Sequence, residues 1–253
     1  MYAPERQAAI ASRTRSNGRV DVASLAQELD VTAETIRRDL TALERRGILR
    51  RVHGGAVAAE RVAIEQSFQE RESANADAKT AIARAALAQI ADASTLVIDG
   101  GATTARLAAM LPTDRELTVI THALPVATLV ATRPNINLHL VGGNVRGRTL
   151  VSVGPWAVDA LASIRADIAV MGTNGLTVES GMTTLDISEA EVKRAVAHAA
   201  RRLIVLADHT KIGRDELITV VPLEAIDTLV TDAAVDPELA ADLASTGLTV
   251  VCA

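Results

Sequence analysis

This sequence of 253 residues contains very few aromatic residues: one tryptophan, one tyrosine and one phenylalanine. A hydrophobic core must therefore be packed from aliphatic residues, which the sequence supplies in quantity, because 49% of its residues are hydrophobic. The single cysteine, Cys252, excludes an intrachain disulfide and a cysteine metal site, and its apolar neighbours favour a small hydrophobic residue in a strand. Lysine is scarce as well, since only Lys79, Lys193 and Lys211 occur. Each lysine is therefore conspicuous near a predicted site.

Long hydrophobic runs are also missing. No apolar stretch approaches the ~18 residues that a membrane-spanning helix needs, and the N-terminus lacks the apolar core of a signal peptide. We therefore expect a cytoplasmic protein with no membrane partner.

The charge is unevenly distributed along the chain. The formal net charge is −5, but residues 1–60 carry +2 and the remainder carries −7. At this length the chain can hold one small domain followed by a medium α/β domain. A basic small domain on an acidic body is typical of a DNA-reading end joined to a separate domain.

Residues 20–55 have the pattern of two short helices separated by a tight turn. Apolar spacing predicts a helix over Val22–Leu29, and Thr32 is placed to cap a second helix over Ala33–Arg46. The inward stripe of that second helix consists of Ile36, Leu40 and Leu43. Basic and hydroxyl side chains then point outward, which suits insertion into the major groove of DNA.

A β-ribbon is expected directly after the second helix. Ile48–Val52 reads as its first strand, and Gly54-Gly55 as its turn, with basic side chains near phosphates. Together with the two helices this predicts a small, mainly α winged helix-turn-helix. The predicted DNA-binding residues are Thr32, Glu34, Thr35, Arg37, Arg38, Thr41, Arg45, Arg50, Arg51 and His53.

Beyond a polar linker the pattern changes to helices that alternate with short apolar runs. The predicted strands are Leu96–Ile98, Leu117–Thr121, Leu138–Val141, Ile168–Met171, Leu203–Ala207, Thr228–Thr231 and Leu248–Val251. Continuously apolar strands with helices between them predict an α/β, Rossmann-like domain with a largely parallel sheet. The expected organisation is a DNA-binding domain over residues 1–58, a linker over 59–75 and the α/β domain over 76–253.

Polar and glycine residues gather where the predicted strands end. Ligands of a parallel sheet bind outside the carboxyl ends of its strands. The glycine-rich turn before Thr103 would offer backbone N–H groups and a helix dipole to an anion. An ordinary strand-to-helix turn is the alternative for each of these segments. The strand-end residues are Asp99, Gly100, Gly101, Ala102, Thr103, Thr104, His122, Gly142, Gly143, Gly172, Asn174, Gly175 and Asp208.

The scarce lysines leave two interpretations open. Lys193 lies four residues after Glu189, so the two can form a surface ion pair or face a ligand. Lys211 can reach a phosphate or stay a solvated loop residue. Nothing has metal-ligand spacing, and no G-x-G-x-x-G motif follows a strand, so neither a metal nor a nicotinamide cofactor is expected.

Several ordered motifs are spread over nearly the whole chain. The N-terminal part carries VTAETIRRDLTALERRGILRRVHGGA, and the remainder carries DGGATT, VGGNVR, EAEVKRAV and LADHTKIG. Together these motifs resemble the DeoR family of bacterial transcriptional regulators. The family motif D-x-G-[ST]-[ST] is matched by Asp99, Gly101 and Thr103, whereas Ala102 replaces a hydroxyl residue. After the next strand the family has Thr-Asn, and here His122 follows Thr121.

The resemblance implies a C-terminal domain like ribose-5-phosphate isomerase and the CoA-transferases, which in this family senses phosphorylated sugars. It adds Arg146, Glu189, Lys193 and Lys211 to the strand-end residues as expected effector contacts. The expected function is a repressor of a sugar operon, with GMTTLDISEAEVKRAV leaning toward fructose or related hexoses. Expected partners are double-stranded operator DNA on the nucleoid, a phosphorylated sugar and further copies of this chain in a homodimer or homotetramer. The alternative is a sugar-phosphate isomerase with a DNA-binding appendage.

Overall fold

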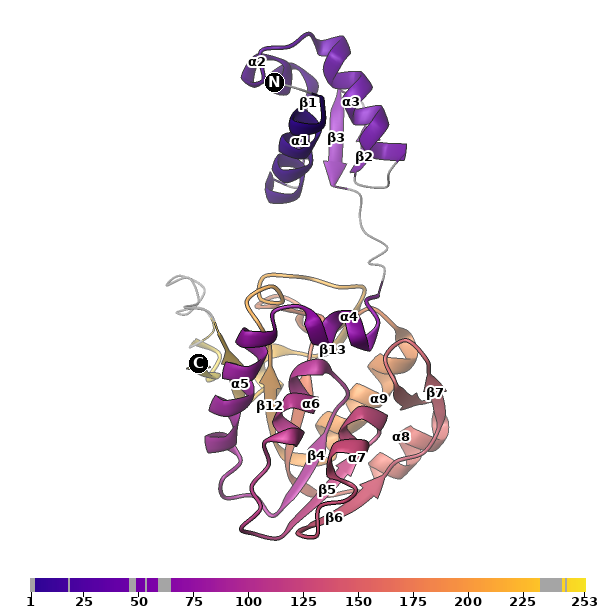
Figure 1. The fold of residues 1–253 in the computed structure, drawn as a ribbon, viewed down its shortest axis with the longest axis vertical. Helices are drawn as coiled ribbons and strands as arrows, with labels where there is room; N and C mark the ends of the chain where they lie inside the picture. The colour runs from indigo at the N-terminus through magenta and orange to yellow at the C-terminus, as the bar shows by residue number, and fades with distance from the viewer. Residues whose placement is uncertain are drawn as a thin grey trace. The chain divides into compact units, whose positions relative to one another are not determined.

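The computed structural model describes residues 3–17, 19–45, 49–52, 54–58, 65–232, 243 and 245–253. The chain forms two compact units, Met1–Ile64 and Glu65–Ala253, each with its own hydrophobic core (Figure 1). The division falls inside the predicted linker, whose second half forms α4 (Phe68–Ser73) and begins the C-terminal unit. In the described part of the chain, none of the helices is long and apolar enough to cross a membrane.

The N-terminal unit is a winged helix-turn-helix, as predicted. Its elements are α1 (Ala3–Asn17), β1 (Arg19–Asp21), α2 (Val22–Glu28), α3 (Ala33–Arg45), β2 (Leu49–Val52) and β3 (Gly55–Ala58). The strands form an antiparallel sheet in the order β1-β3-β2. The sequence did not predict β1, because its three residues include one apolar side chain and its pairing with β3 is long-range. At Gly55 the two strands approach so closely that a Cβ atom would lie 2.1 Å from the Val20 carbonyl oxygen.

The three helices enclose a small aliphatic core. Its fully buried side chains are Ile10, Leu25, Ile36, Leu40, Leu43 and Leu49. The predicted inward stripe of α3 is therefore confirmed. Thr32 caps α3 as predicted, since its Oγ1 accepts a hydrogen bond from the Thr35 N–H at 3.2 Å.

A buried ion pair fixes α1 against α3. Arg6 Nε lies 2.6 Å from Asp39 Oδ2, and the side chains are 11% and 5% exposed. Gln7 Nε2 donates to the other carboxylate oxygen of Asp39 at 3.0 Å. Because Asp39 lies on the inner side of α3, this contact orients the helix whose other side carries Arg38.

The C-terminal unit is built on a seven-stranded parallel sheet in the order β15-β14-β12-β9-β4-β5-β6. Its strands are β4 (Thr95–Ile98), β5 (Leu117–Thr121), β6 (Ile136–Leu140), β9 (Ala166–Gly172), β12 (Ala200–Leu206), β14 (Thr228–Thr231) and β15 (Thr249–Cys252). Each corresponds to a predicted strand, so the α/β class and the parallel sheet are confirmed.

Helices of the C-terminal unit form two groups along the sheet. They are α4, α5 (Ala76–Gln89), α6 (Ala102–Ala109), α7 (Leu124–Val130), α8 (Pro155–Ala162), α9 (Ile187–His198) and the short 3-10 helix η1 (Leu223–Ala225). α5 packs on α6 and α6 on α7, whereas α8 packs on α9 (Figure 1). From β4 the chain runs to one edge through β5 and β6, then returns to β9 on the other side of β4. A crevice for ligands is expected where the strand order reverses, between the carboxyl ends of β4 and β9.

Two smaller antiparallel sheets were not predicted from the sequence. One is the hairpin of β7 (Asn144–Arg146) and β8 (Val151–Val153). The other has the order β10-β11-β13, formed by β10 (Gly175–Thr177), β11 (Gly181–Thr184) and β13 (Ile218–Val221). Each of these five strands has only three or four residues, and several include glycine or threonine, so their periodicity is too weak to detect.

Replacing Asp39 tests the ion pair between α1 and α3. Asp39→Ala should lower the free energy of unfolding of the N-terminal unit by about 3 kcal/mol, because it leaves the buried Arg6 charge without this carboxylate. Urea unfolding of the full-length protein, followed by far-UV circular dichroism, measures the change. The matched control is Glu28→Gln, which breaks an exposed pair with Arg13 and should cost about 0–1 kcal/mol. Equal costs for the two variants would contradict the role given to Asp39.

Candidate functional site

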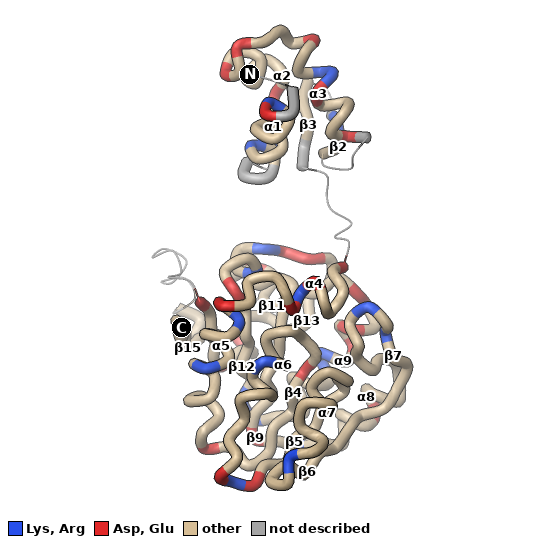
Figure 2. Tube along the Cα trace, in the orientation of Figure 1, with Lys and Arg blue, Asp and Glu red and all other residues tan. Residues whose placement is uncertain are grey.

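The outward side of α3 is the first candidate site. Arg38 is 81% exposed, and Glu34 lies 3.7 Å from it and 3.5 Å from Arg37. Figure 2 shows basic residues along this helix. A shallow concavity is lined here by Glu34, Arg37, Arg38, Thr41, Ala42 and Arg51. The exposed arginines therefore stand on the side of the helix that no core residue occupies.

The wing is attached to α3 by hydrogen bonds from Arg51. Its backbone N–H donates to Glu44 Oε1 at 2.8 Å, and its guanidinium Nη1 donates to Thr41 Oγ1 at 3.0 Å. The structure thus brings five of the predicted DNA-binding residues together in one concavity, while Thr32 and Thr35 lie at the N-terminus of α3. The described residues do not include His53 or the side chains of Arg45 and Arg50.

The second candidate site is a cavity of about 240 Å³ at the carboxyl ends of β4, β9 and β12. This is the place where the strand order reverses. Twelve of the predicted effector residues line it: Asp99, Gly100, Gly101, Ala102, Thr103, His122, Gly172, Asn174, Glu189, Lys193, Asp208 and Lys211. All three lysines of the sequence lie in its lining.

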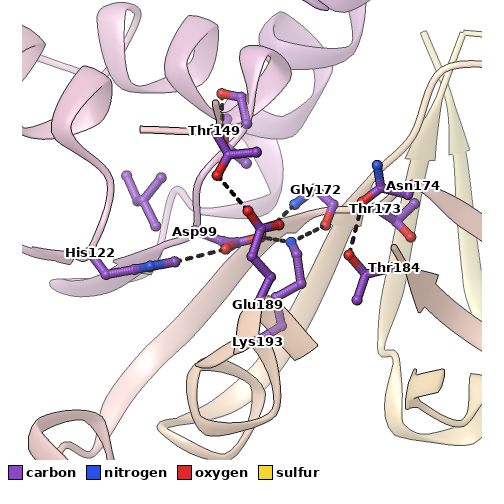
Figure 3. Close-up of polar contacts among 12 residues, drawn as sticks. Asp99, His122, Thr149, Gly172, Thr173, Asn174, Thr184, Glu189 and Lys193 are labelled. Atoms are coloured by element: carbon purple, nitrogen blue, oxygen red, sulfur yellow. Dashed lines mark hydrogen bonds and ion pairs between the residues drawn. The ribbon is translucent and has the colours of Figure 1, made fainter. Parts of the chain in front are cut away.

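Asp99 is the centre of a buried hydrogen-bond network on the floor of the cavity (Figure 3). It is 1% exposed, and its two oxygens accept from His122 Nε2 at 2.9 Å, from the Gly172 N–H at 3.3 Å and from Lys193. Lys193 also donates to the Gly172 carbonyl oxygen at 2.9 Å. Burial alone would raise the pKa of Asp99, but the charge of Lys193 and the hydrogen bond from His122 outweigh it and lower that pKa to about 2.

Glu189 and Lys193 do not form the surface pair considered from their spacing. Both are 5% exposed, and Lys193 pairs with Asp99 instead. Glu189 Oε1 accepts from Thr149 Oγ1 and from Arg146, each at 2.5 Å. The surface-pair interpretation is therefore wrong, because tertiary contacts supply closer partners for both residues.

Cationic groups gather at the other end of the cavity. Lys79 lies 3.2 Å from Asp208, which also accepts from Asn75 Nδ2 at 3.3 Å. Burial lowers the pKa of Lys211, and within the described residues its Nζ makes no hydrogen bond. Arg71 Nε is buried and has no hydrogen-bond partner among the described residues. Donors without protein acceptors favour an anionic ligand at this end.

Five predicted effector residues do not line the cavity. Thr104 is fully buried, and its Oγ1 donates to the Gly101 carbonyl oxygen at 3.0 Å. Gly142 follows β6, and Gly143 lies against the Val153 carbonyl oxygen. Gly175 begins β10, with a Cβ position 2.2 Å from the Arg214 carbonyl oxygen, and Arg146 is engaged by carboxylates. Strand-end position therefore does not by itself place a residue in the cavity.

Several lining residues were not identified from the sequence. They include Arg71, Asn75, Lys79, Thr149 and Arg214. Arg71, Asn75 and Lys79 belong to the predicted linker and the helix before the first strand, so no strand-end rule could find them. The scarcity of lysine could have identified Lys79, because all three lysines of the sequence line the cavity.

Comparison with known proteins gives two family matches. The model described as "DeoR-like helix-turn-helix domain" matches residues 6–62, and the one described as "DeoR C terminal sensor domain" matches residues 74–233. The HTH-type transcriptional regulator GlpR of Haloferax volcanii is 36% identical over 93% of this chain and 92% of its own. The glycerol-3-phosphate regulon repressor of Escherichia coli is 29% identical over 92% of each chain. The structure of ribose 5-phosphate isomerase A from Methanocaldococcus jannaschii, 18% identical over 55% of each chain, has a TM-score of 0.40, which carries no functional argument.

The low pKa of Asp99 predicts a dependence of stability on pH. The pKa is lowered from 3.8 to about 2 in the folded protein, so the contribution of Asp99 to stability is present above pH 4 and is lost as the pH falls through 2. Asp99→Asn should be less stable than the wild type at pH 7. The difference in free energy of unfolding should shrink by about 2 kcal/mol between pH 5 and pH 1. Denaturant unfolding across this range measures it, and parallel profiles for the two proteins would contradict the assigned charge state.

Proposed function

Because the chain belongs to the DeoR family of transcriptional regulators, we propose that it represses a sugar-catabolic operon of the fructose or hexose type and that a phosphorylated sugar relieves the repression. Its relatives are named as regulators, and the chain is a DNA-binding regulator rather than an enzyme. We also propose that the protein acts in the cytoplasm, bound to operator DNA of the nucleoid. The proposal concerns the operon, the effector and the assembly.

The observation that carries the proposal is the cationic end of the cavity. Arg71 presents a buried Nε without a partner, and the Lys211 amine makes no hydrogen bond within the described residues. A phosphate monoester supplies the acceptor oxygens that both groups lack. The relative named as a glycerol-3-phosphate regulon repressor supports a phosphate ester as the signal.

The cavity also offers partners for hydroxyl groups. Asn174, Thr149 and Thr173 line it with amide and hydroxyl side chains, and the carboxylate of Glu189 adds an acceptor. A neutral polyol chain can hydrogen-bond to these groups, whereas a second acidic group would face Glu189. The cationic groups and the hydroxyl partners together favour a sugar that carries one phosphate.

Operator recognition is assigned to α3 and the wing. Arg38 and Arg37 are exposed on the side opposite to the core, and Arg51 is held beside them through Thr41. One recognition helix reads only a few base pairs, so two copies must span two half-sites. We therefore include a homodimer or homotetramer in the proposal. Effector binding then releases DNA by linkage, with a coupling of about 1–3 kcal/mol.

The isomerase alternative would use Asp99 or Glu189 as its catalytic base, and the surroundings of Asp99 do not suit that role. Asp99 is buried, its oxygens already accept from three groups, and its pKa is about 2. A general base works best with a pKa near the operating pH. Asp99 is therefore a charge that organises the cavity floor.

Selection of genomic fragments by the full-length protein at physiological salt tests the proposal. The selection would be repeated with fructose 1-phosphate, fructose 6-phosphate and glycerol 3-phosphate. We expect a repeated half-site beside a sugar operon, with binding lost in the presence of one ester. Binding without sequence preference, or insensitivity to every ester, would sink the proposal.

Lys211→Ala checks the cationic end of the cavity. The variant should need at least about tenfold more ester for the same release, since a hydrogen bond to a charged group contributes about 1.5–3 kcal/mol. Arg84→Ala, which removes an exposed charge from α5 outside the cavity, should respond as the wild type does. An equal response of both variants would remove Lys211 from the site.

Arg38→Ala checks the recognition surface. The variant should lose about 1–3 kcal/mol of operator affinity and relax the sequence preference at its base contact. Its affinity for the sugar phosphate should not change, because Arg38 does not line the cavity. Titration of a selected fragment and of a scrambled duplex measures the preference. An unaltered ratio of the two affinities would show that Arg38 does not read the operator.

A further inference from the structure

Arg146 is surrounded by three carboxylates, one from the start of the C-terminal unit and two from the start of α9. Nη1 and Nη2 donate to Glu65 Oε1 and Oε2 at 2.9 and 2.8 Å, a bidentate contact. Nη1 also lies 2.5 Å from Glu189 Oε1, and Nη2 lies 3.2 Å from Asp186 Oδ2. The hydrogen bonds with Glu65, followed by the charge of Glu189, raise the pKa of Arg146 above its ordinary value, so it stays charged.

One end of this cluster lines the cavity. Glu189 belongs to the cavity lining, and its Oε1 is shared between Arg146 and Thr149, which also lines the cavity. Asp186 caps α9 by accepting from the Glu189 N–H at 3.0 Å, so both acids sit on the first turn of that helix. A ligand that contacts Glu189 or Thr149 therefore acts on the partners of Arg146.

The other end of the cluster is the residue at which the C-terminal unit begins. Glu65 directly follows residues 59–64, through which the chain continues covalently to β3. Its carbonyl oxygen accepts from Arg148, and the Arg148 carbonyl oxygen accepts from the Phe68 N–H at 2.8 Å. The β7–β8 hairpin region thus holds both the side chain and the backbone of Glu65.

The charges of the cluster are out of balance. One guanidinium serves three carboxylates, and the side chains of Arg146, Glu65 and Glu189 are only 21%, 14% and 6% exposed. Water screens such contacts poorly, so a change at one carboxylate alters the attraction of Arg146 for the other two. A hydroxyl group that donates to Glu189 weakens the hold of Glu189 on Arg146. The bidentate pair of Arg146 and Glu65 is then free to shift together.

We propose that Arg146 is a positioning residue that transmits occupancy of the cavity, through Glu189 on one side and Glu65 on the other, to the segment leading into the DNA-binding unit. The inference rests on the proposed function, because it presupposes an effector in this cavity. In this proposal Arg146 takes part in the response to the effector but does not contact the effector. The cavity lining, which omits both Arg146 and Glu65, agrees with that division.

Glu65→Gln is the decisive variant. The substitution keeps the size of the side chain and leaves Arg146 with two carboxylates, so the fold should be retained. Glu65 neither lines the cavity nor belongs to α3. Two affinities should therefore stay within about twofold of the wild type: that for the ester without DNA and that for the operator without ester. The measured quantity is the ratio of operator dissociation constants with and without the ester that releases the wild type. Allosteric ratios are typically about 5- to 150-fold, and in Glu65→Gln the ratio should fall to about 1.

Asp92→Asn is the matched control. It breaks another carboxylate–guanidinium pair of the same unit, with Arg202 at 2.6 Å, and has no contact with the cluster. Its coupling ratio should equal that of the wild type. Arg146→Gln and the double variant with Glu65→Gln extend the test. If the two residues act as one path, the double variant should lose no more coupling than either single variant.

The outcomes separate the two proposals. Release of the wild type by an ester, with the same ratio in Glu65→Gln, would overturn the role of Arg146 and leave the proposed function standing. A lower melting temperature and weaker binding in Glu65→Gln, with the coupling ratio intact, would also overturn it, because the contact would then be structural only. Absence of any ester response in the wild type would overturn the proposed function, and the relay with it.

Discussion

The C-terminal unit depends on the neutralisation of one buried carboxylate. Asp99 follows the central strand β4 and is 1% exposed, a location in which an unpaired charge would be strongly destabilising. Lys193 of α9 and His122, after β5, meet it, and the Gly172 N–H at the end of β9 completes its hydrogen bonds. Four elements that are distant in the sequence must therefore converge at this point. The cavity stands above their meeting place because the strand order reverses there.

Charge pairing recurs throughout the molecule at places where function requires a fixed geometry. In the N-terminal unit, Asp39 and Arg6 orient α3 from its inner side, so that the outer side can present Arg38. In the C-terminal unit, Arg146 gathers Glu65, at the start of the unit's sequence, and Glu189 of α9. Such ion pairs contribute little net free energy of folding compared with hydrophobic burial, but their geometry is directional. A regulator that changes between two states needs contacts of this kind, since a purely aliphatic core gives no preferred response to a polar ligand.

The cavity combines two kinds of group that the chain keeps apart. Its floor is saturated, because Asp99, His122 and Lys193 satisfy one another. Its cationic end has donors without acceptors, in Arg71 and Lys211. The floor therefore provides rigidity, and in the proposed function the cationic end provides the affinity for the phosphate. The sequence pointed to the floor and to Lys211 through strand-end motifs and scarce lysines, but it did not identify Arg71 or distinguish the roles of the two groups.

Local sequence patterns were sufficient to predict the winged helix-turn-helix, the seven parallel strands and just over half of the cavity residues. Each of these follows from local rules: the 3.6-residue stripe of α3, the cap at Thr32 and the continuously apolar runs that become β4 and β9. The pairing of β1, the two small sheets and the partners of Lys193 and Arg146 became visible only in the folded structure. Those outcomes depend on contacts between residues such as Glu65 and Arg146, which are separated by 81 positions. No periodicity within one segment encodes them, because their free energy arises only when the folded chain brings the charges together in a poorly solvated place.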